Sequence, residues 1–153
     1  MNTLISTAYL LLFVLSSSYC DYPLTTKEVP LYIRQSWINV TEPHRTPCIC
    51  ETKVKPTSAY KSMMFTEIPN DPCLKCYYKC LSIKLNLMEA TTGNFVEKEF
   101  LRQIEGVTPE IFKRCNEKLK CEVDLCKKCF GMYLCIVHSV LVPKSHPPID
   151  KYH

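Results

Sequence analysis

The sequence predicts a small all-α domain of about six helices that disulfide bonds hold together. Apolar residues recur at helical spacing in several segments, and no segment shows the alternation of a half-buried strand. Ten of the 11 cysteines lie between Cys48 and Cys135, the remaining one being Cys20. In a secreted chain, cysteines at this density indicate a disulfide framework, which determines which helices touch.

The first twenty residues predict a signal peptide. Residues 8–15 form an apolar run that is too short to span a bilayer and suits the core of a signal peptide. Cleavage after Cys20 makes Asp21 the mature N-terminus and leaves an even ten cysteines, as full pairing requires. We therefore expect a secreted, extracellular protein in which residues 1–20 are removed and residues 21–153 form one domain with five disulfides.

Two short helices are expected first, over residues 27–40 and 57–65. Pro56 opens the second of them, at a position where its missing N–H costs nothing. Pro43 and Pro47 flank the end of the first helix, and proline in a helix interior removes a hydrogen bond and clashes with the preceding turn. The stretch around these two prolines is therefore expected to be irregular.

The central helix is the clearest in the sequence. Asp71 can cap it, with Pro72 at the first helical position. Its apolar stripe at helical spacing consists of Leu74, Tyr77, Leu81, Leu85 and Met88. Cys73, Cys76 and Cys80 recur at i, i+3 and i+7, so these thiols share one neighbouring face of the helix.

Three further helices follow, each with a start signal. Asn94 and Glu97 form a capping box for the first of them. Thr108, which precedes a proline, opens the next. Asp124 caps the last helix, which is expected to run to about Leu141.

Charge and composition exclude several classes of partner. The net charge of +4 is spread with alternating signs, which is typical of a solvated surface and argues against a nucleic-acid partner. No segment after the signal peptide is long and apolar enough for a membrane helix, so stable membrane insertion is not expected. The histidines form no tight metal-ligand spacing, and we expect neither a metal nor a cofactor.

Two gaps between cysteines carry a family resemblance. Three residues separate Cys76 from Cys80, and eight separate Cys126 from Cys135. The sequence around the first gap, Leu-Lys-Cys-Tyr-Tyr-Lys-Cys-Leu at residues 74–81, is similar to the central helix of one family of secreted proteins that has both gaps. The chain resembles the insect odorant-binding proteins of the pheromone and general odorant-binding family.

The resemblance covers about residues 45–141 and implies six helices around an apolar cavity. The first of the six cysteines that characterise the family corresponds here to Cys48 or to Cys50, and the Glu-Thr pair that follows favours Cys48. With the former, the disulfides that the resemblance implies are Cys48–Cys80, Cys76–Cys126 and Cys115–Cys135. The additional cysteines, which resemble those of the cysteine-rich "plus" members, are Cys50, Cys73, Cys121 and Cys129.

The sequence alone does not determine how these additional cysteines pair. If the central and last helices cross antiparallel, Cys73–Cys129 can form beside Cys76–Cys126, which leaves Cys50–Cys121. The local pairs Cys50–Cys73 and Cys121–Cys129 are the alternative, within the geometric limits on bridging. Five bridges exceed what a solid core of this length needs, which favours a hollow domain.

The resemblance implies a carrier that binds small hydrophobic molecules, such as odorants or pheromones, in an internal cavity and transports them through aqueous fluid. The candidate ligand-binding residues are Met63, Phe65, Leu81, Leu85, Phe100, Ile104, Phe112, Phe130, Leu134 and Val137. For any one of them ordinary core packing is the alternative, because apolar helix faces usually meet each other. A membrane chemoreceptor is a candidate partner, and a monomer or weak dimer is expected.

An enzyme is not expected. The chain has no His-Asp dipeptide and no Gly-rich calcium loop of the kind that secreted phospholipases use, and it has no nucleophile–base signature. The alternative function is a secreted protein-binding effector, of the salivary or venom type, on the same disulfide-stapled scaffold, because function depends on sites and not on the fold.

Three further features give hypotheses. His138, in the last helix, is either a pH-dependent latch or an ordinary surface histidine. Asn39 begins an Asn-Val-Thr acceptor sequence for N-glycosylation. The proline-rich, irregular tail 143–153 could cover part of the cavity through Ile149 and Tyr152.

Overall fold

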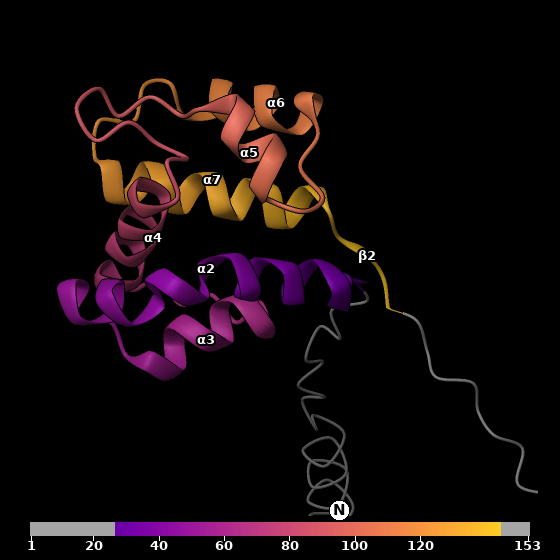
Figure 1. Ribbon diagram of the computed structural model, residues 1–153. Helices are drawn as coiled ribbons and strands as arrows, with labels where there is room; N and C mark the ends of the chain where they lie inside the picture. The colour runs from indigo at the N-terminus through magenta and orange to yellow at the C-terminus, as the bar shows by residue number, and fades with distance from the viewer. Residues whose placement is uncertain (1–26, 145–153) are drawn as a thin grey trace, which may run out of the picture.

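The computed structural model describes residues 27–144, and within them the fold is all-α, as predicted. Its six helices are α2 (Leu31–Thr52), α3 (Pro56–Met64), α4 (Pro72–Lys84), α5 (Glu97–Gln103), α6 (Pro109–Leu119) and α7 (Leu125–Ser139). Two short strands, β1 (Lys27–Glu28) and β2 (Val142–Pro143), pair antiparallel and join the two ends of the described chain. In Figure 1, α2 and α3 lie on one side, α5, α6 and α7 on the other, and α4 connects the two at one end.

The first helix is longer than predicted. α2 continues through Pro43 and Pro47, so the expectation of an irregular stretch there was wrong. The two prolines are four residues apart and exposed, so they stand on one face, and the carbonyls that they deprive of partners face solvent. The opposite face is buried at Trp37 and Cys48, which holds the helix together across the prolines.

Three of the predicted helix starts are confirmed by their capping hydrogen bonds. Asp71 accepts a hydrogen bond from the backbone N–H of Leu74 at 2.7 Å, at the start of α4. Thr108 accepts from Ile111 N–H at 3.3 Å at the start of α6, and Asp124 accepts from two backbone N–H groups of α7 at 2.9 and 3.1 Å. These caps satisfy donors that would otherwise lack partners in the first turn.

The capping box predicted at Asn94 and Glu97 is wrong. α5 begins at Glu97 with Val96 as its N-cap, and no side chain caps it. The carbonyl of Asn94 instead accepts a hydrogen bond from Glu89 N–H at 2.9 Å, which closes a turn in the preceding loop. That loop is fixed to α7 by Lys128, whose Nζ donates to the Gly93 carbonyl at 2.8 Å.

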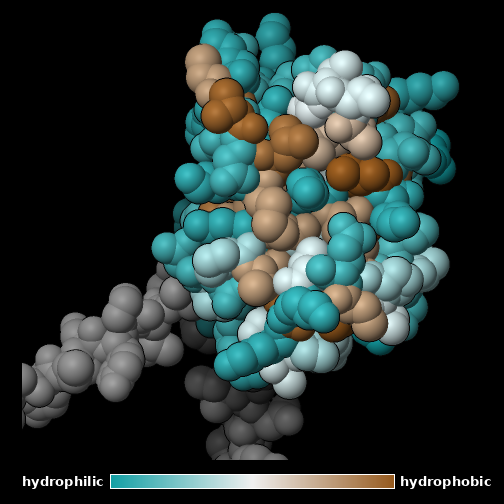
Figure 2. Space-filling view, turned by 90° about the vertical axis from the view of Figure 1, so that its left-hand side faces the viewer, coloured by the Kyte–Doolittle hydropathy of each residue, from teal (hydrophilic) through white to brown (hydrophobic). Residues whose placement is uncertain are grey.

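The core lies between α2, α4 and α7. All five members of the apolar stripe predicted for the central helix are at most 7% exposed, but α4 ends at Lys84, so Leu85 and Met88 lie beyond the helix. Hydrophilic residues cover most of the face shown in Figure 2, where apolar residues form a broken band between them. Pairs such as Arg45–Glu42, 2.9 Å apart, are exposed, and each contributes only about 0–1 kcal/mol.

Three disulfides connect the helices. Cys48–Cys80 joins α2 to α4, Cys76–Cys126 joins α4 to α7, and Cys115–Cys135 joins α6 to α7. These are the three pairs that the family resemblance implied. Helices α3 and α5 contain no cysteine, so no disulfide fixes them.

The additional cysteines do not pair as predicted. Cys50, Cys73, Cys121 and Cys129 are free thiols, so the described residues contain three disulfides and not five. The pair Cys73–Cys129 required an antiparallel crossing of α4 and α7. Cys129 lies instead beside Ser82, and its Sγ is 3.4 Å from Met88 Sδ, so α7 runs from Cys126 towards the C-terminal end of α4, away from Cys73.

The free thiols should differ in reactivity. Cys50 and Cys121 are exposed, whereas Cys129 is 2% exposed and burial raises its pKa to about 11. Near pH 8 we expect iodoacetamide to alkylate the two exposed thiols of the unreduced folded protein, and Cys129 only after denaturation, because the thiolate is the nucleophile. Peptide mapping by mass spectrometry checks this, and unmodified Cys50 and Cys121 would show that these cysteines are oxidised.

Candidate functional site

A cavity of about 70 Å³ lies in the core, lined by α2, α3, α4, α5 and α7 and the segments that follow α4 and α5. Every residue of its wall is buried or half-buried. The wall consists of Trp37, Val40, Thr41, Met63, Tyr78, Leu81, Ser82, Leu85, Leu87, Phe100, Ile104, Cys129, Met132, Tyr133 and Ile136. None of these side chains is an acid, lysine, arginine or histidine, so the cavity presents an uncharged and mostly apolar surface.

Five of the ten predicted ligand-binding residues lie in this wall. They are Met63, Leu81, Leu85, Phe100 and Ile104. They come from α3, from α4 and its end, and from α5 and its end, so the structure brings together residues from three separate segments of the chain. The side chains at these five positions border the cavity, so they do not pack in a part of the core that lacks one.

The other five predicted residues lie elsewhere. Phe65 is 52% exposed and, with Leu134 and Val137, borders a shallow groove on the surface. Phe112 packs against Phe100, with ring centroids 5.3 Å apart, and Phe130 packs against Tyr78 at 5.9 Å. These two are core residues that do not reach the cavity wall.

The structure places a different face of the last helix in the cavity wall from the one predicted. The predicted stripe runs through Phe130, Leu134 and Val137, but the cavity wall contains Cys129, Met132 and Ile136. Both sets recur at helical spacing and differ by a rotation of about one residue, or roughly 100°. The signal for the face that lines the cavity was therefore present in the sequence, but nothing in it distinguished the two stripes.

The polar side of the cavity is built from two tyrosines. The rings of Tyr78 and Tyr133 stack with centroids 4.1 Å apart and an interplanar angle of 18°. The Tyr78 hydroxyl shares a 2.8 Å hydrogen bond with the Ser62 hydroxyl, and the Tyr133 hydroxyl donates to the Ser62 carbonyl. Burial raises the pKa of both tyrosines well above the ordinary value, so both remain neutral.

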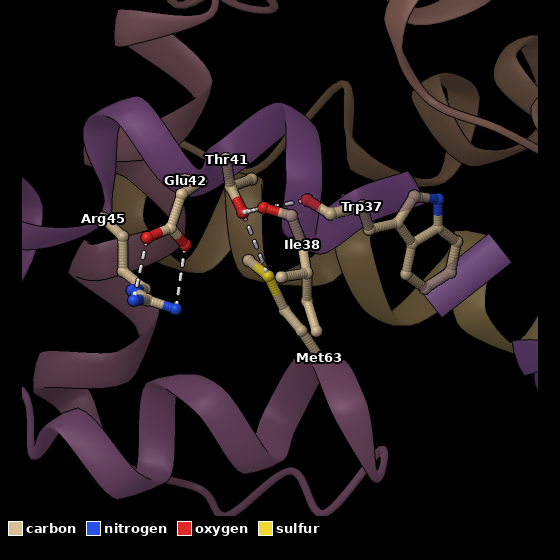
Figure 3. Close-up of polar contacts among 6 residues, drawn as sticks. All are labelled: Trp37, Ile38, Thr41, Glu42, Arg45 and Met63. Atoms are coloured by element: carbon tan, nitrogen blue, oxygen red, sulfur yellow. Dashed lines mark hydrogen bonds and ion pairs between the residues drawn. The ribbon is translucent and has the colours of Figure 1, made fainter. Parts of the chain in front are cut away.

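Thr41 connects the α2 side of the wall to α3. Its hydroxyl donates to the Trp37 carbonyl at 2.8 Å and lies 3.5 Å from the Sδ of Met63 (Figure 3). Figure 3 also shows that Glu42 and Arg45 form their ion pair away from these residues, farther along α2. The hydroxyl of Thr41 is thus already engaged with its own helix.

Ser82 is the hydroxyl with free hydrogen-bonding capacity. It is 9% exposed, and among the described residues it interacts only with the thiol of Cys129. A thiol is a weak hydrogen-bond partner, so a ligand that offers a nitrogen or oxygen atom to the Ser82 hydroxyl can form a stronger hydrogen bond with it. The cavity can therefore favour an apolar molecule with one small polar group.

The cavity is narrower than the hollow interior that the sequence led us to expect. At about 70 Å³ it is smaller than the roughly 150 Å³ cavity known to admit benzene, and well below the roughly 300–1,000 Å³ of drug-sized pockets. A ligand must therefore move side chains when it binds. Met63 and Met132 are suited to this, because methionine is unbranched and flexible.

The remaining predicted features lie on the surface or outside the described part of the chain. His138 is exposed and borders the shallow groove, so it is not part of the cavity wall. Asn39 is exposed on α2, and its glycosylation stays a prediction. The signal peptide 1–20 and residues 145–153 of the tail, with Ile149 and Tyr152, lie outside the described residues.

Other kinds of site find no support within residues 27–144. No three His, Cys, Asp or Glu side chains are grouped there so as to hold a metal ion. None of the helices in that range has the length and apolarity needed to cross a membrane.

Comparison with known proteins gives one match. A family model described as "PBP/GOBP family" matches residues 38–139, which is most of the described chain. No curated protein and no solved structure matches significantly.

Proposed function

The chain belongs to the PBP/GOBP family, the insect odorant-binding protein family, whose members are binding proteins and not enzymes, and we propose that it carries small uncharged apolar molecules in the cavity described above. In this proposal residues 1–20 are removed, and the secreted domain takes up its ligand from aqueous fluid and releases it elsewhere. The observation that carries the proposal is a buried cavity whose wall contains no charged side chain.

The expected affinity follows from the area that a ligand removes from water. Enclosing a molecule with about 300 Å² of apolar surface gains about 7 kcal/mol at the usual coefficient. The loss of translational and rotational freedom and the movement of Met63 and Met132 oppose this gain. Dissociation constants near micromolar are therefore expected.

Saturable uptake of an apolar probe tests the proposal directly. We expect the mature protein to bind N-phenylnaphthylamine with one site per chain, and small compounds such as benzyl alcohol and toluene to displace it. The effector alternative needs no internal ligand. If the folded protein shows no saturable uptake of the probe and no ligand on native mass spectrometry, the carrier proposal fails.

Replacing Ser82 by alanine should change selectivity. Benzyl alcohol can hydrogen-bond to the Ser82 hydroxyl, whereas toluene has the same ring and no polar group. We expect S82A to lower the affinity for benzyl alcohol about 3- to 10-fold, the effect of one net hydrogen bond. The affinity for toluene should change by less than about twofold. Competition against the fluorescent probe measures both, and an equal loss for the two compounds would show that Ser82 does not contact the polar group.

A further inference from the structure

The small volume of the cavity, about 70 Å³, implies that part of the protein must move before a ligand can enter. Every lining residue is buried or half-buried, and the cavity is smaller than any expected ligand. Disulfides fix α2, α4, α6 and α7 to one another. The helices of the wall that can move without straining a disulfide are therefore α3 and α5.

Of these two, α3 buries no aromatic ring. Its buried residues are Ala59, Ser62 and Met63, of which only Met63 is large. α5, in contrast, buries Phe100, whose ring packs against Phe95 at 5.6 Å and Phe112 at 5.3 Å. α3 can therefore move away from the core without separating a cluster of buried aromatic rings, whereas α5 cannot.

Hydrogen bonds hold α3 closed, and they converge on its last turn. The Ser62 hydroxyl bonds to Tyr78, and the Ser62 carbonyl accepts from Tyr133. Arg34 of α2 donates to the carbonyl of Met64 at 2.5 Å. Such bonds are directional and can break and re-form as a unit, unlike the interlocked side chains of a packed core.

The chain on each side of α3 contains a residue in the left-handed backbone region, Lys53 as the C-cap of α2 and Thr66 in the loop after α3. Lys53, just before α3, has φ 60°, and Thr66, just after it, has φ 53°. Non-glycine residues rarely adopt this left-handed region, and for a β-branched threonine it is strained. Strained backbone of this kind is found at switch regions, where a change of conformation relieves it.

We propose that α3 is a hinged gate of the cavity, which opens about Lys53 and Thr66, withdraws Met63 from the wall and is latched shut by Ser62. Opening both admits the ligand and supplies the volume that the closed cavity lacks. The inference rests on the function proposed above, because a gate requires that the cavity be the binding site. The gate sets the rates of uptake and release, whereas the cavity wall sets the affinity.

Stopped-flow fluorescence with N-phenylnaphthylamine tests the gate. Ser62 is not itself a lining residue, so S62A should ease opening while every side chain of the cavity wall stays in place. We expect the association and dissociation rates of the probe each to rise about fivefold, the effect of one net hydrogen bond, with the dissociation constant changed less than twofold. Ser139 on α7 serves as the control, since its hydroxyl bonds to the Cys135 carbonyl and accepts from Arg114, neither of which belongs to α3, so S139A should leave both rates unchanged.

Hydrogen exchange gives a second, independent measurement should S62A fold poorly. In the unmodified protein, the amides of residues 59–64 should exchange faster than those of α4 and α7. The R34M substitution should accelerate the exchange of the amides of residues 59–64 only. If the wild-type protein binds the probe but S62A and R34M leave both rates and the α3 amides unchanged, or if only the dissociation rate changes, the gate is rejected and the carrier function stands. If the wild-type protein does not bind the probe, the carrier function itself is rejected.

Discussion

Filling the cavity should abolish ligand binding without unfolding the protein. Val40 lines the cavity from α2, and V40F places an aromatic ring in the space of about 70 Å³. Ring and ligand cannot share that space without overpacking, which costs roughly 1–3 kcal/mol, so affinity for the probe and for benzyl alcohol should fall about tenfold or more. Probe titration measures the loss, and circular dichroism follows the fold.

The matched control is V123F. Val123 is 90% exposed in the loop before α7, so the same exchange there should leave affinity within about twofold. The stability of V40F should stay within about 1 kcal/mol of the parent or rise, because filling a cavity is commonly stabilising. Unchanged affinity in folded V40F would place the ligand outside this cavity.

Removing the disulfide Cys76–Cys126 should cost the most stability of any change to the cysteines. It closes the longest loop, with a sequence separation of 50 residues, against 32 for Cys48–Cys80 and 20 for Cys115–Cys135. In the chain-entropy treatment, C76A/C126A loses about 4 kcal/mol and C115A/C135A about 3 kcal/mol. Urea unfolding of the purified mature variants measures both values.

The control for the cysteine series is C50S/C121S. Both residues are exposed free thiols, so the free energy of unfolding should change by less than about 0.5 kcal/mol. A loss of several kcal/mol in this control would mean that Cys50 and Cys121 take part in disulfides, and that the three-bridge framework is incomplete.

The features that local chemistry determines could be predicted from the sequence. The caps at Asp71, Thr108 and Asp124 were predictable because an N-cap hydrogen bond spans only two or three residues. The apolar stripe of the central helix was predictable because its residues recur at helical spacing, and all five of them are buried. The prolines of α2 misled the prediction, since their cost depends on whether the affected carbonyls reach solvent, which only the packed structure shows.

The cavity could be predicted only in part, because it depends on how neighbouring helices are rotated. Two apolar stripes run along α7, and the choice between them follows from its crossing with α4. The same crossing direction separates Cys73 from Cys129 and excludes the additional disulfide. The cavity volume is less predictable still, because it is the small remainder after all side chains have packed.

Locating a bound ligand by NMR addresses the central claim most directly. With methyl-labelled methionine and saturating benzyl alcohol, we predict nuclear Overhauser contacts from the ring of the ligand to the methyl groups of Met63 and Met132, on opposite sides of the cavity. Contacts confined to Phe65 and Leu134 in the shallow groove, or no contact with either methionine, would contradict it.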